Sequence, residues 1–163
     1  MPQIPFSQLP PDARVWVFAA EQPVTGAAAE RLLDAVDRHL ATWSAHGAPL
    51  TCAREWRDDR FLTIGVDQST ANASGCSIDG LFRTLRSLEP AIGTSLVGGG
   101  RVLFREPATG EIRAVSRDEF SDLAASGRVG PATRVFDPTV PTLGAWRDGF
   151  ETEAGRSWHA GLL

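Results

Sequence analysis

The spacing of the apolar residues alternates along the chain between a strand-like and a helix-like pattern. The order of these patterns constrains the fold more than any other feature of the sequence. Arg14–Ala19 is a run of apolar and aromatic residues that predicts a buried strand. From Thr25 to Gly47, apolar residues recur at steps of three and four, which predicts a helix that ends at a glycine cap. Two further strand-like runs, Leu50–Trp56 and Phe61–Asp67, flank a short charged segment, which predicts a hairpin.

The next elements complete an alternation of strands and helices. Ile78–Leu88 has a second helical spacing that we expect to end at Pro90, and Val102–Phe104 supplies another strand. The resulting order, βαββαβ, is typical of a ferredoxin-like antiparallel sheet with both helices on one face. We therefore expect an α+β protein with a ferredoxin-like core over residues 1–107.

The last third of the chain predicts a small β-α-β extension. A strand is expected over Ile112–Val115, then a short helix behind the capping sequence Ser116 to Glu119, and then a strand over Arg134–Phe136. No repeat or low-complexity linker separates this segment from the core. We therefore expect residues 108–163 to pack on the core as an extension and a tail.

Composition excludes several classes of function. The 163 residues are 42% hydrophobic, which is enough for a packed core, and no apolar run is long enough to span a membrane. The first residues lack the charged and apolar regions of a signal peptide, so a soluble, cytoplasmic protein is expected. The basic residues are all arginine, which excludes a phosphate-loop lysine, a Schiff-base lysine and a lysine general base.

The sequence also limits the partners. The net charge is −4 and the arginines are scattered among acids, so nucleic acid is not an expected partner, and neither is a membrane. No cofactor is predicted, because the run Gly98–Gly100 lacks the spacing of a phosphate-binding loop. No metal site is predicted, because His39 and His46 lie about 10 Å apart along the expected helix. A small molecule or a protein remains as the partner, and the oligomeric state stays open.

The strongest candidate site is a cysteine between the third predicted strand and the second predicted helix. Backbone N–H groups at a helix start carry partial positive charge, which favours a thiolate and can hold an anion. We therefore predict Cys76 as a nucleophile. The residues expected to bind a ligand around it are Ser74, Gly75, Ser77 and Asp79.

The expected topology brings possible partners to Cys76. The end of the first helix and the end of the third strand should lie at the same sheet edge as the Cys76 loop. His46 would then act as a base and Asp67 would orient its imidazole. His159, in the tail, is the alternative base.

Each of these residues also has a structural explanation. Ser77 can cap the second helix, Asp79 can complement its dipole, and Trp158 can anchor the tail. Three functions therefore stay open. The first is a thiol-dependent enzyme or carrier, acting by acyl or thiol transfer, hydrolysis or redox sensing. The second is a non-catalytic module that binds a small ligand or anion, with Trp43 and Trp158 as pocket walls, and the third is a structural or interaction protein in which Cys76 only helps to form a helix start.

Three segments carry a resemblance to known proteins: Trp43-Ser44-Ala45-His46-Gly47, Ala73-Ser74-Gly75-Cys76-Ser77-Ile78-Asp79 and Ser157-Trp158-His159-Ala160. The chain resembles a family of small, uncharacterised bacterial proteins that share these motifs over nearly the whole length. The resemblance implies a bacterial source and a site at the same residues, and it implies no activity. Some members carry the label ABC transporter ATPase, which this lysine-free sequence does not support.

Overall fold

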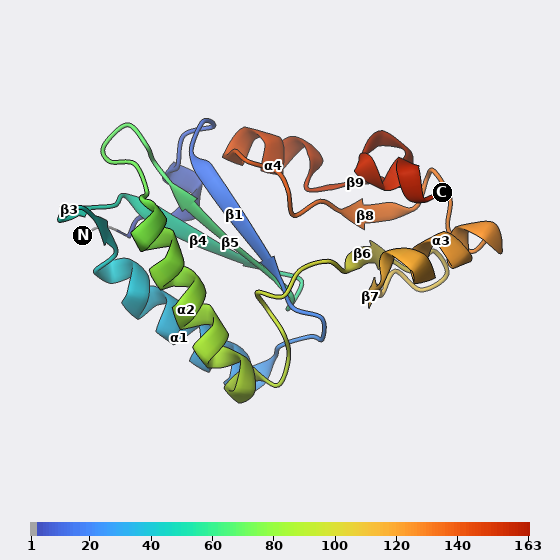
Figure 1. Ribbon diagram of the computed structural model, residues 1–163, viewed down its shortest axis with the longest axis horizontal. Coiled ribbons are helices and arrows are strands. Elements are labelled where there is room, and N and C mark those ends of the chain that lie inside the picture. The colour runs from blue at the N-terminus through green and yellow to red at the C-terminus, as the bar shows by residue number, and fades with distance from the viewer. Residues whose placement is uncertain (1–2) are drawn as a thin grey trace.

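Two antiparallel sheets organise the chain in the computed structural model, which describes residues 3–163 (Figure 1). The first sheet has the order β1-β5-β4 and the second has the order β7-β6-β8-β9. The first consists of β1 (Arg14–Ala19), β4 (Cys52–Arg57) and β5 (Phe61–Val66). The second consists of β6 (Val102–Arg105), β7 (Ile112–Val115), β8 (Arg134–Phe136) and β9 (Glu151–Glu153). The mixed α+β class is confirmed.

Helices cover both sheets (Figure 1). Two long helices, α1 (Gly26–Ala41) and α2 (Gly75–Ile92), pack side by side on one face of the first sheet. The later helices are α3 (Arg117–Ala125) and α4 (Leu143–Gly149). The short elements are β2 (Ser44–Ala45), β3 (Ala48–Pro49) and three single-turn 3₁₀ segments, Phe6–Gln8, Ala154–Arg156 and Trp158–Leu162.

The first helix ends earlier than its sequence predicts. Leu32, Val36 and Leu40 recur every fourth residue and are fully buried against the first sheet, but α1 stops at Ala41. The chain then forms the tight β2–β3 hairpin, whose turn residues His46 and Gly47 have φ angles of 52° and 79°. A two-residue hairpin turn requires such left-handed angles. The prediction that His46 lies in the last turn of a helix is therefore wrong.

The second helix begins with a reciprocal cap. The Ser74 hydroxyl accepts a hydrogen bond from the N–H of Ser77, and the Ser77 hydroxyl accepts one from the N–H of Ser74. The helix continues through Pro90, where it was expected to end, and stops at Gly93, whose φ is 76°. A proline this close to the end removes only one hydrogen bond, and the glycine supplies the left-handed cap.

The ferredoxin-like order is not formed. The arrangement β1-β5-β4 matches the first three predicted strands, but the fourth, β6, lies between β7 and β8 in the second sheet. This strand is buried on both faces: Leu103 packs between the two sheets, and Phe104 packs on Phe120 of α3, with ring centroids 5.4 Å apart. The first sheet covers one face of β6, and α3 covers the other.

The boundary expected between residues 107 and 108 falls inside the β6–β7 hairpin, which Glu106 closes by donating its N–H to the carbonyl of Glu111. The second sheet therefore begins at β6, and the elements from there on include α4 and β9 in addition to the predicted β-α-β.

The two sheets share an aromatic core. Phe61 of β5 packs against Phe136 of β8 and against Phe150, which follows α4, with ring centroids 4.5 and 5.1 Å apart. All three rings are almost completely buried. The face of the first sheet opposite α1 and α2 is therefore covered by the C-terminal elements.

Candidate functional site

Cys76 is an exposed free thiol at the second residue of α2. It lies in a hollow of about 490 Å³ on the outer face of this helix. The lining residues are spaced three or four apart on that face: Cys76, Asp79, Phe82, Arg83 and Arg86. The capping pair described above fixes the start of the helix and thereby the position of the thiol.

The hollow carries positive charge. Among residues 3–163, neither Arg83 nor Arg86 has a carboxylate oxygen within 4.0 Å. Asp79 lies one turn before Arg83 and forms no ion pair with it within that distance. A guanidinium presents several N–H donors in a plane that matches a carboxylate or phosphate. The hollow therefore places a thiol beside two groups suited to an anion.

The structure does not bring His46 or Asp67 into this hollow. His46 is exposed at the tip of the β2–β3 hairpin, and Asp67 follows the end of β5. Asp67 Oδ1 accepts hydrogen bonds from the hydroxyl and the N–H of Ser69, at 2.7 and 3.0 Å. These hydrogen bonds lower the pKa of Asp67, and they hold its carboxylate in a local turn.

His159 lies in the C-terminal 3₁₀ segment Trp158–Leu162 and packs against Phe120 of α3. Figure 1 shows this segment, drawn in red, beside the second sheet and at the opposite end of the molecule from α2. The His159 side chain is completely buried, and Nδ1 shares a hydrogen bond with the Ser157 hydroxyl at 2.6 Å. Burial lowers the pKa of His159 to about 4. The structure therefore does not bring His159, the alternative base, to Cys76.

The two candidate tryptophans have structural contacts. The Trp158 indole stacks on His159 and donates a hydrogen bond to Asp137 Oδ1 at 3.1 Å, which fixes the tail. Trp43 is buried and donates to the backbone carbonyl of Ser77 at 2.9 Å. Trp43 thus supports the first turn of α2 from beneath, and neither indole lines the hollow.

His39 is a neighbour of α2 that sequence reasoning missed. Its Nδ1 lies 3.1 Å from the Thr84 hydroxyl, and its Cε1 lies 4.0 Å from the point where a Cβ on Gly80 would stand. Burial lowers the pKa of His39, which favours the neutral imidazole. The sequence signal for this contact was Gly80, which lies inside the helix one turn after Cys76. A residue without a side chain leaves room there for a neighbouring ring.

The two cysteines differ sharply. Cys52 in β4 is fully buried, and its thiol donates to the carbonyl of Leu40 at 3.6 Å. Burial raises the pKa of Cys52 to about 12, so this thiol is inert at neutral pH. Cys76 is therefore the cysteine that a reagent in solution can reach.

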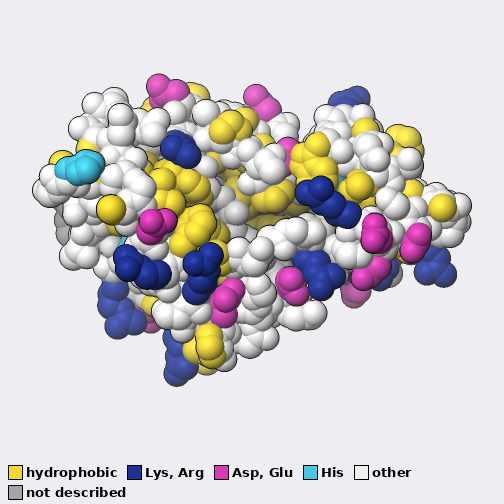
Figure 2. All heavy atoms as spheres, viewed as in Figure 1, with side chains coloured by type: hydrophobic (Ala, Val, Ile, Leu, Met, Phe, Trp, Pro, Cys, Tyr) yellow, Lys and Arg dark blue, Asp and Glu magenta, His cyan; other side chains and the backbone are white. Residues whose placement is uncertain are grey.

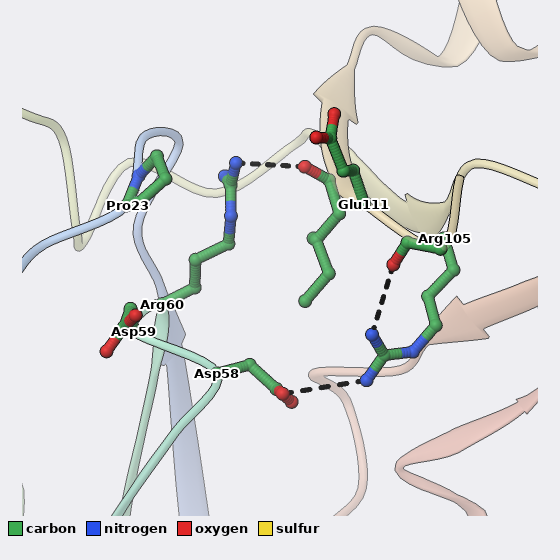
Figure 3. Close-up of a pocket in the computed structure, with 8 residues that line it drawn as sticks. Pro23, Asp58, Asp59, Arg60, Arg105 and Glu111 are labelled. Atoms are coloured by element: carbon green, nitrogen blue, oxygen red, sulfur yellow. Dashed lines mark hydrogen bonds and ion pairs between the residues drawn. The ribbon is translucent and has the colours of Figure 1, made fainter.

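A second hollow, of about 510 Å³, lies between the β4–β5 turn and the β6–β7 hairpin (Figure 3). The buried guanidinium of Arg60 donates to the carbonyls of Glu21 and Ile112, at 2.7 and 2.9 Å. Arg105 donates to the carbonyl of Gly110 and pairs with Asp58 at 3.6 Å. Because the protein itself occupies both guanidinium groups, this hollow connects the two sheets and is a weaker candidate for a ligand.

Within residues 3–163, no helix has the length and apolar character needed to cross a bilayer. The same residues contain no group of three or more histidine, cysteine or acidic side chains placed to hold a metal ion. No known protein family, curated protein or solved structure matches the chain.

Proposed function

We propose that the protein uses Cys76 as a surface thiol that exchanges with small anionic disulfides, in a redox-sensing or thiol-carrier role. One observation carries the proposal: an exposed thiol at a helix start shares a hollow with two arginines that have no ion-pair partner in the described residues. The guanidinium groups attract a carboxylate-bearing reagent to the hollow that holds the thiol.

The proposed reaction is thiol–disulfide exchange. The Cys76 proton passes to solvent, and the sulfur attacks one sulfur of the disulfide. A new sulfur–sulfur bond forms as the old one breaks, and the second sulfur leaves as a thiolate. The disulfide is the oxidant, and one Cys76 thiol is oxidised to a mixed disulfide for each thiolate released.

This step does not need an imidazole close to the sulfur. Acyl transfer and hydrolysis call for a base within hydrogen-bond reach of the nucleophile, and the lining residues of the hollow include no histidine. Exchange with a small disulfide is therefore better supported than either of those reactions.

Non-catalytic anion binding in the same hollow is the second candidate. The free guanidinium groups of Arg83 and Arg86 favour it without any role for the sulfur. Binding of an anionic ligand that survives Cys76→Ser and is lost in Arg83→Gln/Arg86→Gln would select this function.

Alkylation kinetics test the proposal in a Cys52→Ala background, in which Cys76 is the thiol that is alkylated. The rate constants for anionic iodoacetate and neutral iodoacetamide are measured by mass spectrometry at low ionic strength. We expect their ratio to exceed the ratio for free cysteine several-fold, and to fall toward it in Arg83→Gln/Arg86→Gln. Oxidised glutathione should form one mixed disulfide at Cys76.

Arg38→Gln, which removes an exposed arginine of α1, is the matched control and should leave the ratio unchanged. A ratio equal to that of free cysteine, together with no mixed disulfide, would contradict the proposal.

A further inference from the structure

The edge of β1 is a second surface with a defined chemistry. β1 is an outer strand of the first sheet, and the strand expected beside it, β6, lies in the second sheet. The start of this edge is occupied: the N–H of Val15 donates to the carbonyl of Pro141, and Arg14 forms an isolated bridge with Thr142. Just past the end of β1, the N–H of Glu21 donates to the carbonyl of Ser95, so the open stretch lies between these two contacts. From Trp16 to Ala19, β1 pairs with β5 alone among the described strands.

The backbone direction along this edge follows from two hydrogen bonds. The N–H of Ala20 donates toward the β5 side, to the carbonyl of Arg60, whereas the N–H of Val15 points the opposite way. Backbone groups of successive residues in a strand alternate between its two sides. Val17 and Ala19 therefore present their N–H and carbonyl groups to the open edge.

An apolar groove follows the same edge. It consists of two adjoining hollows of about 170 and 250 Å³, both lined by Val17, Phe18, Phe82 and Pro138. Phe82 of α2 forms one wall and packs edge-on against Phe18, with centroids 5.2 Å apart. Pro138, in the loop after β8, lines the groove from the side of the second sheet. Figure 2 shows hydrophobic surface gathered in the depression between the two halves of the molecule.

The shape of the groove selects a narrow occupant. The β1 edge is recessed between Phe82 and Pro138, so the β1 edge of a second copy, recessed in the same way, cannot reach it. A single extended segment is about as wide as the 4.8 Å spacing between strands and can enter. Its alternate side chains would face the helices on one side and the second sheet on the other, and both sides are apolar.

The charged residues around the groove indicate which residues should flank the apolar ones in the bound segment. Arg14 lines the groove at the start of β1, and Arg83 and Arg86 line the neighbouring Cys76 hollow, which shares Phe82 with the groove. Within residues 3–163 none of these three has a carboxylate oxygen within 4.0 Å. Glu21, also on the rim, is paired with Arg101. On a chain of net charge −4, this local positive charge favours an acidic segment.

We infer that the groove binds a short extended segment of a partner protein, with β-branched residues on both faces flanked by acidic residues, which adds to β1 as a fourth strand. Main-chain hydrogen bonds to Val17 and Ala19 provide affinity, and the apolar walls select the side chains. The inference does not need the Cys76 thiol, although Phe82 lines both the groove and the Cys76 hollow and the charge of Arg83 and Arg86 serves both.

Amide hydrogen exchange followed by NMR tests the free edge. In the isolated protein, the amides of Val17 and Ala19 should exchange at least tenfold faster than those of Trp16 and Phe18, which point toward β5. Equal protection of all four amides would overturn the inference.

A labelled peptide tests the occupant. The probe is a fluorescein-tagged Asp-Glu-Val-Thr-Val-Thr-Val-Glu, followed by fluorescence anisotropy. Its control is the same peptide with N-methyl groups on the three valines. We expect binding at micromolar concentrations, protection of the Val17 amide in the complex, and a loss of at least tenfold in affinity on N-methylation.

Variants of the protein locate the site. Phe82→Ser should weaken peptide binding at least fivefold, and Arg83→Gln/Arg86→Gln should weaken it in a salt-dependent manner. Cys76→Ser should leave binding unchanged, which separates this surface from the thiol. No binding at 1 mM, equal binding of the N-methylated peptide, or a dimer that occludes the Val17 amide would each overturn the inference.

Discussion

The contact between the two sheets has one closed side and one open side, and the residues on the two sides differ in kind. On the closed side, the rings of Phe61, Phe136 and Phe150 pack together. On the open side, Phe82 and Pro138 line a groove along an unpaired strand edge. The same pair of sheets thus uses one side to hold the molecule together and leaves the other available.

Charge distinguishes the two sides further. On the closed side, Glu151 accepts hydrogen bonds from Arg57 and Arg105, and Arg134 lies 3.6 Å away. The Arg57 and Arg105 guanidinium groups also lie over the Phe136 ring, at 5.7 and 5.3 Å from its centroid. On the open side, Arg14, Arg83 and Arg86 have no carboxylate oxygen within 4.0 Å among the described residues. A paired arginine is therefore structural here, and an unpaired one is available to a ligand.

The largest expected effect comes from breaking the closed side. Phe61→Ala removes a fully buried ring from the aromatic cluster and should cost about 3–5 kcal/mol of unfolding free energy, measured by urea denaturation. Phe82→Ala, in the half-buried wall of the groove, should cost less than half as much. Equal losses would show that the groove supports the fold as strongly as the cluster.

Removing the central carboxylate tests the charged part of the closed side. Glu151→Gln should cost about 2 kcal/mol, because three arginines then face a neutral side chain. Glu153→Gln, two residues further in β9, is the control and should cost less than about 0.5 kcal/mol, because its pair with Arg156 is exposed.

The same carboxylate predicts a pH dependence. Burial alone would raise the pKa of Glu151, but hydrogen bonds and positive charge from Arg105 and Arg57 lower it below the usual value. The contribution of Glu151 to the free energy of unfolding is therefore fully present above the unfolded-state pKa, roughly 4.3. It is lost as the pH falls through the lower folded-state value. Glu151→Gln should flatten the stability profile in that acidic range.

A second pH dependence of stability is expected from His159, in the C-terminal elements beyond the contact between the sheets. Its folded-state pKa of about 4 lies below the ordinary 6.5, so the unfolded chain binds a proton first as the pH falls. Stability should decline between these two values by at most about 1.4 kcal/mol per pH unit. His159→Gln should remove that slope in urea titrations at pH 7 and pH 5, and an unchanged slope would show that another group titrates.

The smallest expected effect lies at Gly80, where α2 meets His39 of α1, away from the contact between the sheets. A Cβ on Gly80 would meet its nearest neighbours at 3.8 and 4.0 Å, which is ordinary contact. Gly80→Ala should therefore raise the unfolding free energy by about 0.5–1 kcal/mol. Gly93→Ala, at a φ of 76°, is the control and should be destabilising in thermal melts.

Local pattern predicted most elements of the fold. The β4–β5 hairpin, the start of α1 near Thr25 and the α3 helix capped by Ser116 all follow from apolar spacing and capping residues. The sheet that contains β6 could not be predicted, because an apolar strand such as Val102–Phe104 suits any position covered on both faces.

The candidate site was predicted only in part. Cys76 was placed correctly at the start of a helix, because its small, polar neighbours are typical of a cap. His46 was misplaced because Trp43, which packs on the same core as α1, continues the helical spacing past the helix end. His159 was misplaced because nothing in the local sequence shows that Trp158 and His159 are fixed to the C-terminal elements.

The contrast between the two cysteines has a practical consequence for spectroscopy. Because Cys52 is sealed in the core, a maleimide dye should attach to Cys76 without any mutagenesis. The dye would sit beside Phe82, which also walls the groove along β1. The unmodified chain therefore offers its own attachment point for an optical reporter of groove occupancy, in bulk or one molecule at a time.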